Sequence, residues 1–131
     1  MFGGQTGGMA FAMKRVYDAP EASDGYRVLV DRLWPRGVSK ERAELDEWEK
    51  DVAPSPDLRT EWHHSGDPGR FDEFAARYRD ELDANPAAEG LLETGRAHER
   101  VTLLFGARDE RVNHAAVLLD WLAAHGAAIE D

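Results

Sequence analysis

Charged and aromatic side chains follow directly after an apolar segment in residues 28–37, which read Val-Leu-Val-Asp-Arg-Leu-Trp-Pro-Arg-Gly. A buried strand does not accommodate isolated ionised groups, so the charges at its end require either paired partners or a ligand. The guanidinium groups of Arg32 and Arg36 offer forked donors that suit a carboxylate or a phosphate. We therefore expect these two arginines and Trp34 to bind a small anion, with Asp31 beside them.

A second set of polar side chains follows residues 101–106, which read Val-Thr-Leu-Leu-Phe-Gly. The ordinary pKa of a histidine, about 6.5, lies close to working pH, so His114 can act as a general acid or base that Asp109 orients. Asn113 stands at the start of a predicted helix, whose free amide groups favour an anion. We assign proton transfer to His114, Asp109 and Asp31, and ligand binding to Asn113 together with the arginines and tryptophan of the first set.

Three functions are compatible with these residues. The first is an enzyme of hydrolase or transferase type that acts on a small phosphorylated or carboxylated metabolite. The second is a non-catalytic module that senses an anion or contacts a partner protein. The third is a metal-dependent hydrolase whose ligands are Asp31, Asp109 and His114. The structural alternative to all three is that Asp31 pairs with a neighbouring arginine and only stabilises the turn.

Other familiar sites receive little support. The chain has no Walker-type loop, no dinucleotide-type glycine fingerprint, no nucleophile-elbow serine and no His-Glu-x-x-His motif, so no cofactor is assigned. His63, His64 and Asp67 resemble a metal cluster, but neighbouring helical residues point about 100 degrees apart, and we predict a solvated helix end without a metal. The acidic residues of segment 46–51 are predicted to be solvated; the alternative is that its first and last residues turn back toward the arginines.

The elements that position these residues alternate between strand and helix. Strands are predicted at residues 13–17, 26–33 and 101–106, with a last edge strand at 127–129. Short polar residues followed by proline predict helix starts at Ser55-Pro56, Asp67-Pro68 and Asn85-Pro86. Further helices are expected at 39–45 and 113–125. This alternation predicts an α/β single domain over residues 13–131, with a small, mainly parallel sheet flanked by helices in Rossmann-like layers.

The ends and the core of the domain follow from apolar spacing. Residues 1–12 contain four glycines and no charge, and we expect a disordered leader or a start extension. An apolar stripe at helical spacing runs through Phe71, Phe74, Ala75, Tyr78 and Leu82. Tyr78 and Trp48 are predicted core residues with satisfied polar tips, and the spacing of Trp48 and Val52 suits one helical turn.

The overall charge excludes several classes of partner. The chain of 131 residues has 26 acidic and 16 basic side chains, and its net charge is -10. Such a surface repels phosphate backbones and anionic lipid, so we expect neither nucleic-acid nor membrane binding. The chain has no cysteine and shows no secretory signal, which predicts a cytoplasmic location.

Several motifs together resemble the YeaO-like branch of the bacterial DUF488 family. They are Val-Asp-Arg-Leu-Trp-Pro-Arg-Gly (30–37), Ala-Pro-Ser-Pro-Asp-Leu-Arg (53–59), Phe-Asp-Glu-Phe-Ala-Ala-Arg-Tyr-Arg-Asp-Glu-Leu (71–82), Val-Thr-Leu-Leu (101–104) and Asn-His-Ala (113–115). The resemblance extends over residues 13–122. It implies a compact α/β domain with two sets of signature positions, Asp31, Arg32, Trp34, Pro35 and Arg36 in the first and Asp109, Asn113 and His114 in the second. It implies no established reaction.

The chain departs from the wider family at two places. Wider members tend to have a cysteine after the late strand and a Cys-His-Arg triplet, where this chain has Phe105 and residues 113–115. Any thiol chemistry of those relatives therefore does not transfer. The branch motif Trp-Phe-x-His-Asp corresponds here to residues 61–67, with two residues inserted, so His64 is a doubtful equivalent of the family histidine.

Overall fold

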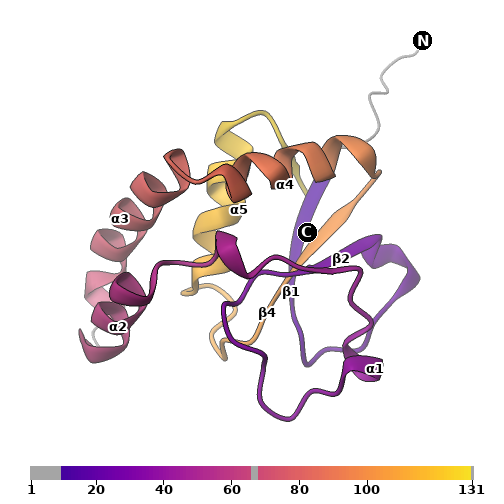
Figure 1. Cartoon of the computed structure of the whole chain (residues 1–131), viewed down its shortest axis with the longest axis horizontal. Coiled ribbons are helices and arrows are strands. Elements are labelled where there is room, and N and C mark those ends of the chain that lie inside the picture. The colour runs from indigo at the N-terminus through magenta and orange to yellow at the C-terminus, as the bar shows by residue number, and fades with distance from the viewer. Residues whose placement is uncertain (1–9, 66–67, 131) are drawn as a thin grey trace.

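Five parallel strands form one sheet in the computed structural model, which describes residues 10–65 and 68–130, with the backbone alone at 63–65 and 68. The strands are β1 (Ala10–Arg15), β2 (Tyr26–Leu29), β3 (Glu47–Trp48), β4 (Val101–Phe105) and β5 (Ala128–Ile129). Their order in the sheet is β3-β2-β4-β1-β5, and every pairing is parallel. Figure 1 labels β1, β2 and β4. The predicted α/β single domain with a mainly parallel sheet is confirmed.

The described helices connect these strands. They are α1 (Lys40–Ala43), α2 (Pro56–Ser65), α3 (Phe71–Asp83), α4 (Pro86–Ala97) and α5 (His114–Ala124). Short 3-10 turns occupy Ala22–Asp24, Lys50–Val52 and Pro68–Arg70. None of the helices in the described ranges is long and apolar enough to cross a membrane.

Polar side chains cap the helices where the sequence predicts it. The side chain of the preceding residue accepts a first-turn amide hydrogen bond in four cases, at Ser39, Ser55, Asn85 and Asn113. The predicted starts at Ser55-Pro56 and Asn85-Pro86 are thereby confirmed. Asp67 lies outside the described residues, and α3 begins at Phe71 after the 3-10 turn.

The first strand begins earlier than the sequence analysis predicts. β1 starts at Ala10 and ends at Arg15, so residues 10–12 belong to the sheet and the expected leader extends too far. Phe11 is fully buried and pairs with both β4 and β5. The short segment shows no clear alternation of apolar and polar residues, so its sequence does not indicate a strand. Its burial depends on its two neighbours in the sheet, β4 and β5, which are distant in the sequence. Residues 1–9 lie outside the described part of the chain.

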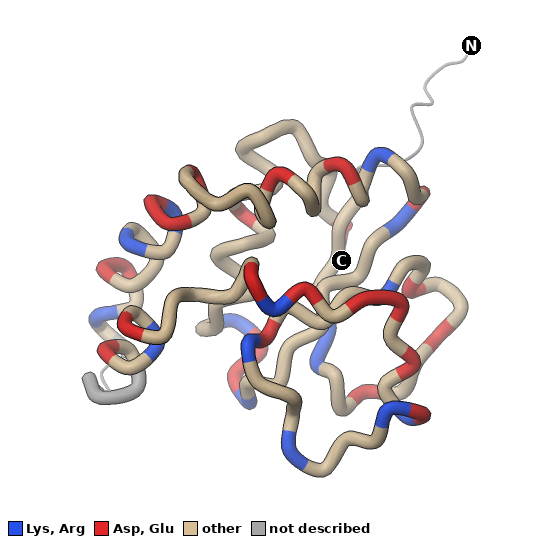
Figure 2. Tube along the Cα trace, viewed as in Figure 1, with Lys and Arg blue, Asp and Glu red and all other residues tan. Residues whose placement is uncertain are grey.

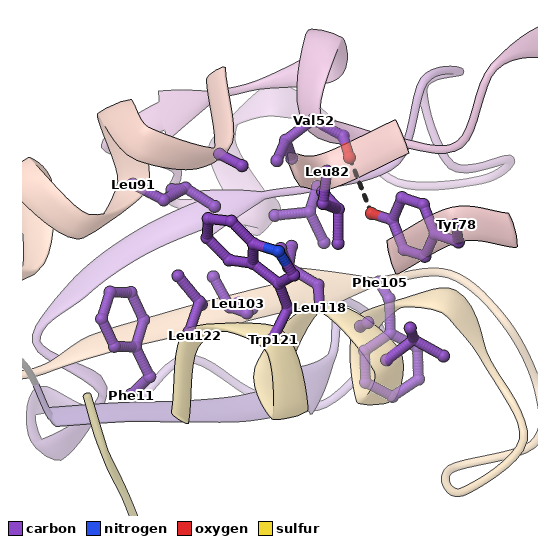
Figure 3. Close-up of a cluster of buried hydrophobic side chains, with 14 of the residues drawn as sticks. Phe11, Val52, Tyr78, Leu82, Leu91, Leu103, Phe105, Leu118, Trp121 and Leu122 are labelled. Carbon is purple, nitrogen blue, oxygen red and sulfur yellow. Dashed lines mark hydrogen bonds between the residues drawn. The ribbon is translucent and has the colours of Figure 1, made fainter. Parts of the chain in front are cut away.

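One face of the sheet packs against α2 to α5 and forms the main core. Figure 3 shows side chains of β1, β4, α3, α4 and α5 meeting in one cluster. The stripe predicted on α3 is confirmed for four of its members, which are buried, while Phe71 packs partly exposed at the edge. Tyr78 is fully buried and donates a hydrogen bond of 2.6 Å to the carbonyl of Val52, as predicted.

The opposite face of the sheet is covered differently. Val16, Leu29 and Leu104 form a small apolar cluster beneath the loop between β2 and α1. Beside it lies a buried polar network, in which the Asp24 carboxylate accepts from Lys14 and Arg27. A sheet face without long helices is therefore closed by a loop, the short α1 and paired charges.

Segment 46–53 corrects two expectations. Glu47 and Trp48 form β3 beside β2 rather than a helical turn. The amide of Glu49 donates to the carbonyl of Leu29, which would otherwise lack a partner at the edge of β2, and only Lys50–Val52 makes a short 3-10 turn. Trp48 is 38% exposed and is not a core residue. Its polar tip is satisfied, since the indole N–H donates to the carbonyl of Asp31.

Candidate functional site

The two predicted sets of polar residues meet because β2 and β4 are neighbours in the sheet. Both strands run in the same direction, so their carboxyl ends lie side by side. A hydrogen bond of 2.8 Å from the amide of Gly106 to Oδ2 of Asp31 joins the two ends. Asp31 therefore pairs with backbone here rather than with a neighbouring arginine.

His114 lies at the start of α5 and reaches across to the end of β2. Its Nε2 is 3.1 Å from the carbonyl oxygen of Val30 and 3.1 Å from Oδ1 of Asp31. Both oxygens are acceptors, so Nε2 carries the ring proton. The N–H group forms its hydrogen bond with Val30, and the buried Oδ1 has no hydrogen-bond partner among the described residues. Only Nδ1 of this histidine remains to accept a proton.

A pocket with a volume of about 340 Å³ opens at this edge of the sheet. Six of the seven predicted site residues line it, namely Asp31, Arg32, Trp34, Arg36, Asn113 and His114. The loop after β2 supplies four of them, and the start of α5 supplies two. The topology thus brings together side chains that are separated by about eighty positions in the sequence, as His114 and Asp31 show directly.

Three arginines line the pocket. Arg32 is held by long hydrogen bonds of 3.3 and 3.4 Å to the carbonyls of Ala53 and Pro54. Arg36 and Arg59 are exposed, the second on the first turns of α2. Within the described part of the chain none of the three forms a salt bridge, although the protein carries an excess of acidic groups. The guanidinium groups of Arg36 and Arg59 are therefore available to a ligand, whereas Arg32 already uses Nε and one Nη for backbone carbonyls.

Aromatic residues hold the loop that carries the first two arginines. The indole N–H of Trp34 donates to the carbonyl of Val38 at 2.7 Å, and its ring meets that of Trp48 edge to face. The hydroxyl of Tyr17 donates to the carbonyl of Arg36. The loop is therefore tied to the turn after β1 and to β3, which sets where its side chains reach the pocket.

Asn113 and Asp109 have structural tasks. Asn113 caps α5 through Oδ1 and donates through Nδ2 to the carbonyl of Asp109, so both polar atoms of this buried side chain are engaged. Asp109 is exposed and does not line the pocket. Backbone hydrogen bonds from Val112 and Arg111 hold the pKa of Asp109 below its ordinary value. Asp109 stabilises the turn before α5 rather than orienting His114.

Sequence reasoning missed the contributions of α2. Arg59 and Trp62 line the pocket beside the predicted residues. A signal was present, because the helix start at Ser55-Pro56 places the first turns of a helix at the carboxyl edge of a parallel sheet, where ligands gather. Which side chains of that helix face the pocket depends on how it packs against α3, and the sequence does not reveal this.

The metal hypotheses find no support in the geometry. The described residues contain no group of three or more His, Cys, Asp or Glu side chains placed to hold an ion. Asp31 and His114 approach each other, but Asp109 does not join them. The side chains of His63, His64 and Asp67 lie outside the described residues. Asp46 accepts from the amide of Arg27 instead of turning back toward the pocket.

Gly106→Ala is expected to destabilise the protein by about 1–3 kcal/mol, because an added methyl group overpacks the junction of β2 and β4. A Cβ at this position would lie 3.0 Å from Oδ2 of Asp31 and 3.7 Å from Cβ of Pro35. Gly90→Ala is the control, since nothing lies within 4 Å of its added Cβ on the exposed face of α4, and a gain of about 0.5–1 kcal/mol is expected. Urea unfolding measures both, and equal effects of the two changes would contradict a tightly packed junction.

Comparisons with known proteins match nearly the whole chain. A family model described as "Inactive DUF488-N3 subclade" matches residues 10–130. The uncharacterized protein YeaO of Escherichia coli K12 is 44% identical over 114 residues, which cover 87% of this chain and 97% of YeaO. The uncharacterized proteins Mb3100c of Mycobacterium bovis and Rv3073c of Mycobacterium tuberculosis are each 48% identical over 109 residues, covering 82% of this chain and 89% of theirs. No solved structure gives a significant match.

Proposed function

Since the chain belongs to the YeaO-like branch of the DUF488 family, we propose that it is a binding protein for a small anion rather than an enzyme. The ligand occupies the pocket at the carboxyl ends of β2 and β4. The arginines hold its negative charge, and the protein performs no chemistry on it.

The observation that carries this proposal is the set of three arginines, Arg32, Arg36 and Arg59, that line one pocket without salt-bridge partners in the described structure. Asp31 is the one acidic side chain among the described residues of the lining, and its Oδ2 already accepts from Gly106. Guanidinium groups that line one pocket favour a carboxylate or phosphate, because each presents planar donors that match two oxygens.

The proton-transfer candidates are partly engaged by the backbone, which leaves Nδ1 of His114 and Oδ1 of Asp31 as their remaining polar atoms. Nε2 of His114 is committed to the carbonyl of Val30, and Oδ2 of Asp31 is committed to an amide. Asp109 is outside the pocket lining. The lining has no serine, threonine, lysine or cysteine among the described residues, so its possible nucleophiles are the Tyr17 hydroxyl, the Asp31 carboxylate and the His114 imidazole. The family description as inactive agrees with this arrangement.

The distribution of charge favours a small ligand over a polymer. The net charge is -10, and Figure 2 shows acidic positions spread over the helices and over the segments around β3. The loop from β2 to α1 carries two arginines and one acidic residue, Asp31. A long polyanion would meet the repulsive exterior, whereas a small anion enters the local basic site. We propose a cytoplasmic metabolite as the source of that anion.

Arg36→Ala is expected to weaken binding of inorganic phosphate or acetate about tenfold or more, because a charge-assisted hydrogen bond is lost. Arg79→Ala is the matched control, since Arg79 is an exposed arginine on α3 that has no salt bridge in the described structure and does not line the pocket. Titration followed by amide NMR shifts gives the dissociation constants, with Gly106 and Ala107 as reporters at the pocket.

Two results would overturn the proposed function. The first is equal weakening by the two arginine changes, which would mean that the anions bind by general charge and not in the pocket. The second is turnover, for example release of phosphate from a phosphomonoester by wild type that His114→Ala abolishes. That outcome would replace the binding protein with the enzyme of the first hypothesis.

A further inference from the structure

We infer that the ligand is an amphipathic anion, in which one carboxylate or phosphate group is attached to an apolar body about the size of an aromatic ring. This inference rests on the proposed function, because it specifies the ligand of the same pocket. It comes from the walls of the pocket rather than from its charges.

Apolar side chains from separate segments form much of the pocket wall. They come from the loop after β2, the segment before α2, α2 itself and the turn before α5, and include Leu33, Trp34, Pro54, Trp62 and Val112. Leu33 is 58% exposed, the largest value among the exposed large hydrophobic residues of the described structure. An exposed leucine at the mouth of an apolar pocket gains burial when a ligand covers it.

The cations and the apolar wall are interleaved. The guanidinium group of Arg32 bonds to the carbonyls of Ala53 and Pro54, so it lies directly against a wall residue. Because Ala53 and Pro54 also line the pocket, an oxyanion bound to this guanidinium places its attached atoms beside their apolar side chains. A bare inorganic ion gains nothing from that contact, whereas a ring-bearing anion does.

The size of the pocket agrees with such a ligand. Its volume of about 340 Å³ falls at the lower end of the range typical of small-molecule sites, about 300–1,000 Å³. Each water molecule of the liquid occupies about 30 Å³, so an inorganic anion would leave most of the space to water. A single ring with its anionic group would displace that water from the apolar wall.

The test compares matched ligands at constant ionic strength. Phenyl phosphate and inorganic phosphate form one pair, phenylacetate and acetate form the other, and benzyl alcohol supplies the ring without the charge. We expect each ring-bearing anion to bind at least about tenfold more tightly than its partner without the ring. The stronger of phenyl phosphate and phenylacetate identifies the anionic group.

Leu33→Ser and Ile129→Ser give the matched pair of variants. Both residues are exposed and apolar, but Ile129 lies on edge strand β5 and does not line the pocket. Leu33→Ser is expected to weaken phenyl phosphate about five- to tenfold and to leave inorganic phosphate unchanged, whereas Ile129→Ser changes neither. Because both side chains are at the surface, both variants should fold.

The outcomes separate this inference from the proposed function. Equal affinities within each pair, still weakened by Arg36→Ala, would overturn the amphipathic ligand and leave the anion pocket standing. Benzyl alcohol that binds as tightly as phenyl phosphate, with no effect of Arg36→Ala, would overturn the anion pocket itself. Absence of binding by all five compounds at millimolar concentration would overturn both.

Discussion

Asp24→Ala is expected to lower the free energy of unfolding by about 3–5 kcal/mol, because it leaves two cations without their buried partner. Asp24 and Arg27 are each 4% exposed, and the Asp24 carboxylate also accepts from Lys14 at 3.1 Å. The guanidinium group of Arg27 also donates to the carbonyls of Ala43 and Glu44 at the end of α1. It therefore cannot turn to solvent without breaking the hydrogen bonds that hold α1 against the sheet. Urea unfolding monitored by circular dichroism measures the loss.

Glu21→Ala is the control for this change. Glu21 pairs with the same lysine, but its side chain is 66% exposed, and exposed ion pairs contribute about 0–1 kcal/mol. Asp24→Asn keeps the shape and removes the charge, which provides a second variant if the alanine protein does not fold. Equal effects of Asp24→Asn and Glu21→Ala would contradict the stabilising role of the buried network.

The pH dependence follows from the pKa of Asp24. Burial acts to raise this pKa, but the hydrogen bond from the amide of Glu21 and the cations of Lys14 and Arg27 outweigh it and hold the pKa below its ordinary value. The folded state therefore binds this proton less readily than the unfolded state. The stabilisation is complete above the unfolded pKa of about 3.9 and is lost as pH falls through the folded pKa. Asp24→Asn should flatten the acid limb of the stability profile.

Tyr78→Ala is expected to lower the free energy of unfolding by about 3–5 kcal/mol, because it opens a cavity at the centre of the main core. The ring is fully buried between Phe74 and His114, with centroids at 5.8 and 6.3 Å. Its hydroxyl ties α3 to the carbonyl of Val52 in the turn after β3 (Figure 3). The tyrosine therefore links the core to the wall of the pocket.

Tyr78→Phe separates the hydroxyl from the ring. This change leaves the carbonyl of Val52 without its donor, and a cost of about 1–3 kcal/mol is expected. Burial, followed by the charges of Glu81 and Asp31, raises the pKa of Tyr78 well above its ordinary value. Stability is thus complete below pH about 10 and falls at higher pH, where the unfolded tyrosine ionises first. A phenylalanine variant as stable as wild type, with an unchanged alkaline limb, would contradict this role.

Local chemistry predicted most of the elements. Ser55 and Asn85 precede prolines, and those pairs mark the starts of α2 and α4 because they satisfy or remove orphan amide groups within a few residues. The apolar run of residues 101–106 predicts a strand for a similarly local reason, and its central place in the sheet comes from the structure. The sequence pattern predicts β1 too late in the chain and wrongly predicts Trp48 in the core, because the true positions of both depend on partners that are distant in the sequence.

The sequence by itself determined strands β2 and β4, the caps, the charge of the chain and the meeting of two polar strand ends, because each depends on short-range spacing or on the polarity of a parallel sheet. Only the tertiary structure decided what those polar residues do. It ties His114 to Val30 and Asp31 to Gly106, sets Asp109 outside the pocket lining and adds Arg59 to the wall. These outcomes depend on which side chains pack between elements, and that choice is settled by competition among many non-local contacts rather than by the pattern of any one segment.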